Sequence, residues 1–172
     1  MTGKQRINIR QPGFTLIELL VVISAIALLS TVVLVAVGSA RSKALDQKII
    51  TSMLAIPKQA DVYLGAKTDT YDYVCANVDN TLCNTGAGTD CTAGPAGAAT
   101  AFGNIEKEIM AANGNKTVRC RESTDKKAFA VSSPLVYLSG YYWCIDSRGF
   151  KDKFAGTEIP AGACVATSCA CQ

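Results

Sequence analysis

From Gly13 to Val37 the chain reads GFTLIELLVVISAIALLSTVVLVAV, and Glu18 is the one charged residue in this run. As a helix that rises about 1.5 Å per residue, residues 14–37 would be about 36 Å long, whereas the hydrocarbon core of a bilayer is about 30 Å thick. The run therefore predicts a helix that spans a membrane. Glu18 near its start calls for a physical explanation, because a charged group is costly in hydrocarbon.

The flanks of the apolar run predict its orientation. Lys4, Arg6 and Arg10 precede it with no acidic residue among them, so the positive-inside rule places the N-terminus in the cytoplasm and the rest of the chain outside. All the cysteines follow the run, and an even number of them in an exported domain favours disulfides. The eight candidates are Cys75, Cys83, Cys91, Cys120, Cys144, Cys164, Cys169 and Cys171.

Two simpler interpretations of the run are a secretory signal peptide and a plain membrane anchor. Gly38-Ser39-Ala40 ends in small residues, as a signal-peptidase site does. However, the apolar run is longer than the roughly 7–15 residues of a signal-peptide core, and Glu18 lies within it. A plain anchor leaves Glu18 without a role.

A family resemblance supplies a third interpretation. Gly13-Phe14-Thr15-Leu16-Ile17-Glu18 before a long apolar helix resembles the N-terminal signature of type IV pilins and of the pseudopilins of type II secretion, the class III signal family. The resemblance covers residues 4–45. It implies that a prepilin peptidase cuts between Gly13 and Phe14, that Phe14 is then N-methylated, and that the chain assembles through its helix.

Charge chemistry supports this resemblance. Cutting before Phe14 creates a new α-amine, which can pair with Glu18 of another copy and neutralise both charges in a medium of low dielectric constant. Such a pair would also set the register between neighbouring helices, and head-to-tail contacts of this kind generate filaments. Many major pilins have glycine and proline where this chain has Ala27 and Val35, so Gly38 is the nearest flexible point.

The pattern predicts three segments: a cytoplasmic leader at 1–13, a transmembrane and filament-core helix at 14–38, and an exported globular domain at 39–172. Beyond Gly38 the helix becomes amphipathic, with Asp46 among its polar residues, and Pro57 is expected to kink or end it locally. The fold class is α+β: a long N-terminal helix, about 14–64, whose C-terminal half packs on a small antiparallel β-meander stapled by disulfides.

Within the globular domain, local signals predict the remaining elements. Small residues predict a loop, which Cys83 and Cys91 could staple, and an apolar face followed by Asn113-Gly114 predicts a helix. The loop is expected at 84–100, the helix at 102–112, strands at 117–121, 128–132 and 135–145 with a break at Ser139–Gly140, and turns at 123–126 and 146–149. Cys120 and Cys144 lie in predicted strands, which makes them the best candidate pair.

The composition argues against several kinds of chemistry. There is no histidine, and without the three basic residues of the leader the chain has 14 basic and 14 acidic residues. We therefore predict no catalytic residue, no cofactor, no metal site and no specific nucleic-acid partner. Weaker candidates are soft-metal ligation by Cys164, Cys169 and Cys171, calcium ligation by Asp146, Asp152 and Glu158, an aromatic patch of Tyr137, Tyr141, Tyr142 and Trp143 that is half core, and a glycosylation acceptor at Asn115.

The predicted function is structural. The chain is expected to wait in the inner membrane, to be processed by prepilin peptidase, and to join copies of itself through the pilus or secretion machinery. The product would be an extracellular type IV pilus or, alternatively, a periplasmic pseudopilus of a secretion or DNA-uptake system. The alternative from another class is a membrane-anchored, disulfide-rich binding module that does not polymerise.

Overall fold

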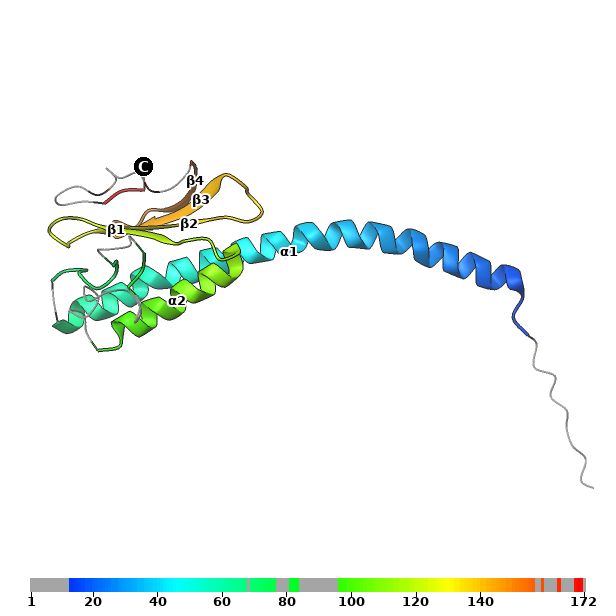
Figure 1. Cartoon of the computed structure of the whole chain (residues 1–172), viewed down its shortest axis with the longest axis horizontal. Helices are drawn as coiled ribbons and strands as arrows, with labels where there is room; N and C mark the ends of the chain where they lie inside the picture. Colours follow the sequence, from blue (N-terminus) through cyan, green and yellow to red (C-terminus); the bar gives the residue numbers. More distant parts are fainter. Residues whose placement is uncertain are drawn as a thin grey trace, which may run out of the picture. The chain divides into compact units, whose positions relative to one another are not determined.

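The computed structural model describes residues 13–67, 69–76, 81–83, 96–156, 159, 164 and 169–171. Its elements are α1 (Leu16–Lys67), α2 (Ala98–Asn113), β1 (Arg119–Glu122), β2 (Phe129–Pro134), β3 (Tyr141–Asp146) and β4 (Lys151–Ala155) (Figure 1). The chain divides into two compact units, Met1–Ser39 and Ala40–Gln172, and α1 contributes residues to both. A long N-terminal helix, a four-stranded antiparallel sheet and disulfides confirm the α+β prediction.

The second half of α1 has one buried face. Apolar side chains recur there at helical spacing and are fully buried: Ile49, Met53, Ile56 and Ala60. They form the main core together with residues of α2 and of the sheet. This is the packing that the amphipathic pattern predicted.

Pro57 lies inside α1 and does not end it. A proline in a helix interior costs about 3 kcal/mol. The neighbouring Ile56 and Ala60 are fully buried in the main core, and this burial offsets that cost. The helix therefore continues to Lys67, a little beyond the predicted end at Leu64.

Helix α2 begins four residues earlier than predicted, at Ala98 instead of Phe102. The extra residues are three alanines and a threonine, and alanine has the highest helix propensity. The loop predicted for 84–100 therefore overlaps α2 at its end, while residues 84–95 lie outside the described residues. The predicted stop at Asn113-Gly114 is confirmed: Gly114 has φ 78°, and its N–H donates to the carbonyl of Met110.

The sheet is an antiparallel meander in the order β1-β2-β3-β4. The strand predicted at 135–145 begins only at Tyr141, because the preceding residues form a tight connection in which the Tyr141 N–H donates to the Leu138 carbonyl at 3.0 Å. Strand β4 was not predicted. It is an exposed edge strand that carries Lys151, Asp152 and Lys153, and such charges protect sheet edges but hide the apolar alternation of a strand.

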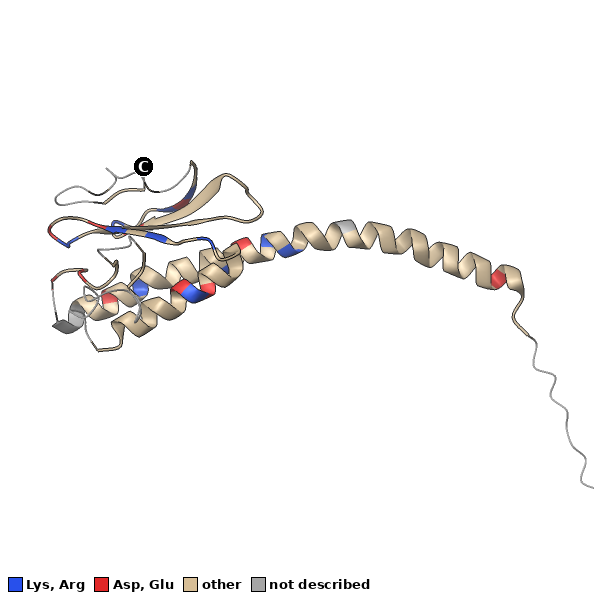
Figure 2. Ribbon diagram, viewed as in Figure 1, with Lys and Arg blue, Asp and Glu red and all other residues tan. Residues whose placement is uncertain are grey.

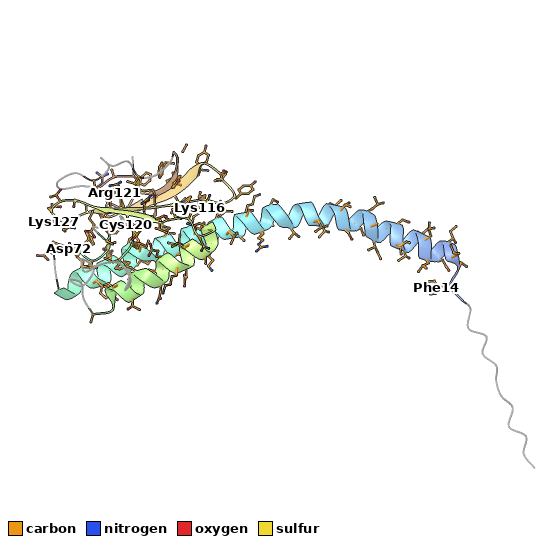
Figure 3. The ribbon with its side chains drawn as sticks, viewed as in Figure 1. Phe14, Asp72, Lys116, Cys120, Arg121 and Lys127 are labelled. Atoms are coloured by element: carbon orange, nitrogen blue, oxygen red, sulfur yellow. A yellow bond between two sulfur atoms is a disulfide. The ribbon has the colours of Figure 1, made fainter. Side chains whose placement is uncertain are left out.

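The two faces of the sheet contribute to two different cores. Neighbouring strand residues point to opposite faces. Cys120 pairs with Val131 on the face that packs on the helices, and both belong to the main core (Figure 3). Cys144 pairs with Ser132 and points to the other face, where it joins a smaller core with Ala130 and Cys171.

This register shows why the predicted Cys120–Cys144 disulfide is wrong. Strand β2 lies between the two cysteines, and their side chains point to opposite faces of the sheet. The bonds between described cysteines are Cys75–Cys120, Cys144–Cys171 and Cys164–Cys169. Cys83 is also disulfide-bonded, and the predicted staple from it to Cys91 falls partly outside the described residues.

Asp46 connects α1 to the sheet. It was predicted on the polar face of the helix, but it is only 5% exposed. Its Oδ1 accepts the backbone N–H of Val136 at 2.6 Å and of Tyr137 at 3.1 Å, and its Oδ2 accepts that of Leu138 at 3.4 Å. One carboxylate on α1 therefore satisfies three successive donors of the connection between β2 and β3.

We expect Asp46→Ala to lower the free energy of unfolding by about 2–3 kcal/mol, because the three N–H groups lose their acceptor. Urea denaturation of the full chain in detergent measures this loss. Asp46→Asn keeps one carbonyl oxygen as an acceptor and should lower the free energy of unfolding by less. Lys48→Ala, at an exposed position of the same helix, is the matched control and should change stability by no more than about 0.5 kcal/mol. A loss from Asp46→Ala no larger than the control's would contradict this role.

Because Tyr73 is buried, the free energy of unfolding is expected to depend on pH in the alkaline range. It is 1% exposed, and its hydroxyl donates to the Ala60 carbonyl at 2.8 Å. Burial first, and then the neighbouring Tyr71 and Asp61, raise the pKa of Tyr73 from 10.0 to about 12. A pKa raised by folding means that the stabilisation is complete below pH 10 and is lost as the pH rises toward 12.

We therefore expect the free energy of unfolding to fall between pH 10 and 12 and Tyr73→Phe to reduce that slope. Urea denaturation at a series of pH values gives the slope, and ultraviolet absorbance of tyrosinate follows the ionisation. Tyr137→Phe is the control, because its ring is exposed. Equal slopes in the Tyr73→Phe variant and the unmodified chain would contradict the assignment.

Candidate processing and assembly site

The predicted cleavage site lies just before α1. Gly13, Phe14 and Thr15 are not helical, and α1 begins at Leu16 (Figure 3). The Phe14 side chain is 87% exposed. A Cβ added to Gly13 would meet no atom within 4 Å, so packing among the described residues does not demand glycine there. Among the described residues, nothing covers the junction.

Thr15 and Glu18 form a capping box at the start of the helix. The Thr15 N–H and hydroxyl both donate to Glu18 Oε2, at 2.9 and 2.8 Å. In return, the Glu18 N–H donates to Thr15 Oγ1 at 3.3 Å. Reciprocal bonds of this kind satisfy backbone donors that the first turn of a helix otherwise leaves unpaired.

The capping box gives Glu18 a role that the sequence analysis did not identify. A plain anchor was said to leave Glu18 without a role, but the carboxylate has one within its own chain. The Thr-x-x-Glu spacing was the signal that could have found it. Among the described residues both hydrogen bonds that Glu18 accepts end on Oε2, which leaves Oε1 to a partner.

The apolar part of α1 matches the expectation for a membrane span. The segment Leu16–Leu64 contains a window long and apolar enough to cross a membrane, and none of that window is buried within the structure. Figure 2 shows no acidic or basic residue between the first turn of α1 and the residues beyond Gly38. Gly38 itself lies within the helix.

The few hydroxyl groups of this segment are satisfied by the helix itself. Ser24 donates to the Leu20 carbonyl. Ser30 and Thr31 donate to carbonyls in the preceding turn, each at 2.8 Å. These side chains therefore add little polar surface to the span.

The predicted aromatic patch divides between core and surface. Trp143 packs partly buried against the main core, and Tyr142 contacts Phe154 with 5.8 Å between ring centroids. Tyr137 and Tyr141 remain 45% and 39% exposed. Of the four aromatic residues, Trp143 packs against the core, Tyr142 is half-buried, and the other two are exposed, so less of the patch is core than the predicted half.

The other weak candidates are placed as follows. Among the described residues, no three His, Cys, Asp or Glu side chains gather as metal ligands would. Asp146 Oδ1 accepts the N–H groups of Arg148 and Phe150 and so closes the turn after β3, while Glu158 lies outside the described residues. Asn115 is exposed just after α2, and its glycosylation stays a prediction.

Comparison with known proteins identifies the N-terminal segment only. Residues 8–37 match the model of the prokaryotic N-terminal methylation motif, the class III signal of type IV pilins and pseudopilins. No curated protein and no solved structure matches the chain. The motif supports a pilin-like or pseudopilin protein with a structural role.

Proposed function

We propose that this chain, which carries the class III signal at residues 8–37, is the structural subunit of a type IV pilus or pilus-like filament. Prepilin peptidase cuts it between Gly13 and Phe14 and methylates Phe14. The observation that carries the proposal is the motif match on an unobstructed Gly13-Phe14 junction at the start of an exposed apolar helix.

The capping box is compatible with this processing. Cleavage before Phe14 leaves the Thr15 N–H, the Thr15 hydroxyl and Glu18 in place, so the bonds to Glu18 Oε2 survive the cut. Glu18 Oε1 then accepts the new α-amine of a neighbouring copy. The pair neutralises two charges in the apolar filament core and fixes the offset between adjacent helices.

The disulfides favour a pilus over a pseudopilus. Every described cysteine is disulfide-bonded, as suits a fibre that leaves the cell. The second candidate is a pseudopilin of a secretion or DNA-uptake system, which has the same anchor. Comparing fibres sheared from cells with periplasmic extracts distinguishes the two.

Intact-mass analysis of the protein from membranes and from sheared fibres tests the processing. We expect a chain that begins at Phe14 and carries one added methyl group. Replacing Gly13 with a bulkier residue should leave the unprocessed chain in the membrane, because the proposed cleavage follows this glycine. The chain should still fold, since a side chain at position 13 would meet no other described atom. An N-terminus at Met1, or at Arg41 after signal-peptidase cleavage, would contradict the proposal.

A further inference from the structure

Few large hydrophobic side chains are exposed among the described residues after Val37. The exposed ones are Val62, Tyr137 and Tyr141. The two tyrosines lie at the same end of the sheet, on either side of the turn in which the Tyr141 N–H donates to Leu138. Lys43 of α1 places its Nζ 4.9 Å from the centroid of the Tyr137 ring. We name Lys43, Tyr137 and Tyr141 the tyrosine patch.

A hollow of about 380 Å³ adjoins this patch. Its lining mixes apolar side chains, among them Leu138 and Trp143, with charged groups of both signs, Lys43 and Lys153 beside Asp46 and Asp152. Such a surface suits a partner with both apolar and charged parts. Trp143 is the single tryptophan of the chain, so its fluorescence reports on this surface.

The patch is tethered close to the end of the apolar run. Lys43 follows Val37 by six residues, which is about 9 Å along a helix and at most about 21 Å of extended chain. Asp46, three residues later, holds the backbone of Val136–Leu138 against α1. The headgroup layer of a bilayer adds roughly 5–8 Å on each side of the hydrocarbon. The patch is thus within reach of the headgroups.

The length of the apolar run also favours contact between the tyrosine patch and the lipid headgroups. Residues 14–37 would span about 36 Å against a hydrocarbon core of about 30 Å, an excess that a tilt of roughly 30° removes. Tyrosine and lysine at a membrane interface are the anchors that set the direction of such a tilt. Exposed Arg41 and Lys43 add attraction for anionic lipids.

We propose that the tyrosine patch binds the headgroup region of the outer leaflet while the chain is a membrane-anchored monomer. This inference rests on the membrane-anchored state of the proposed function. The occupant is the lipid surface rather than a second copy, because the patch is tethered to the span by a few residues of the same chain. Assembly then has to lift the patch from the lipid.

Tryptophan reporters test the contact in the full chain, reconstituted in phosphatidylcholine–phosphatidylglycerol vesicles. In a Trp143→Phe background, Tyr137→Trp places the reporter in the patch. Val62→Trp is the matched control, because Val62 is 65% exposed but lies 25 residues beyond Val37 on the same helix. Phospholipids brominated near the headgroup should quench the reporter at 137 and leave the one at 62 unquenched, whereas aqueous iodide should do the reverse.

The native Trp143 gives a second measurement. The double variant Tyr137→Ser with Tyr141→Ser should reduce its quenching by brominated lipid, and Lys43→Gln should reduce the added quenching that phosphatidylglycerol causes. Circular dichroism checks that each variant is folded, and the Tyr137→Trp reporter carries the test if the double variant is not. Equal lipid quenching at 137 and 62 would overturn the proposal.

Dilution separates lipid from protein contact. A reporter at 137 that is shielded from iodide at a high protein-to-lipid ratio, and that on dilution becomes open to iodide without being quenched by brominated lipid, would show that the patch contacts a second copy, and this too overturns the proposal. Intact mass and filament yield are measured on the same variants. A correctly processed, assembling chain with an unquenched reporter refutes the lipid contact alone, whereas an unprocessed chain refutes the proposed function.

Discussion

Replacing Glu18 with valine is expected to leave membrane insertion intact and to reduce filament assembly to background. Valine is compatible with the bilayer, so the apolar helix remains a membrane span. The variant can no longer neutralise the α-amine of a neighbouring Phe14, which then stays charged and unpaired in the filament core. Membrane fractionation measures insertion, and the amount of sheared filament measures assembly.

Glu18→Gln separates the two roles of this side chain. Glutamine can keep the capping box, since its carbonyl oxygen can accept the Thr15 N–H, but it carries no charge. If charge pairing drives assembly, Glu18→Gln fails almost as completely as Glu18→Val. Normal filament yield from Glu18→Gln would show that the capping box is the role that matters, and the pairing model would be wrong.

The N-terminal segment was predictable because its signals are local. The apolar run, the leader charges and the Gly13-Phe14 junction lie within consecutive residues, and none needs a partner from elsewhere in the chain. The amphipathic face of α1 is equally local, since helical spacing alone brings Ile49, Met53 and Ile56 together. The ends of α1 and α2 were less accurate, because alanine-rich termini and tertiary burial extend helices past their sequence signals.

The errors arose where distant residues meet. Asp46 reads as a surface residue of a helix, and only the fold brings the connection between β2 and β3 to it. The disulfide pairing needed the register of the sheet, because Cys120 and Cys144 share the meander but not a face. Strand β4 escaped prediction because an exposed edge strand has no apolar period.

We expect removal of the Cys75–Cys120 disulfide, by Cys75→Ala with Cys120→Ala, to be the most destabilising change in the globular domain. Both cysteines are buried in the main core, and the bond closes a loop of 45 residues. Loop-closure entropy assigns such a cross-link about 4 kcal/mol, a large share of the roughly 5–15 kcal/mol that stabilises a domain. The segment around Cys75 would then be held only by noncovalent contacts, such as the bond that the Cys75 N–H donates to Glu122 Oε1 at 2.7 Å.

Cys164→Ala with Cys169→Ala is the matched control, because that bond closes only 5 residues and is assigned about 2 kcal/mol by the same relation. Urea denaturation of both variants in detergent gives the two free energies of unfolding. Equal losses would show that loop length does not decide the contribution of these bonds. A larger loss at the short bond would instead indicate that the smaller core around Cys144 and Cys171, and not the main core, limits the stability of the domain.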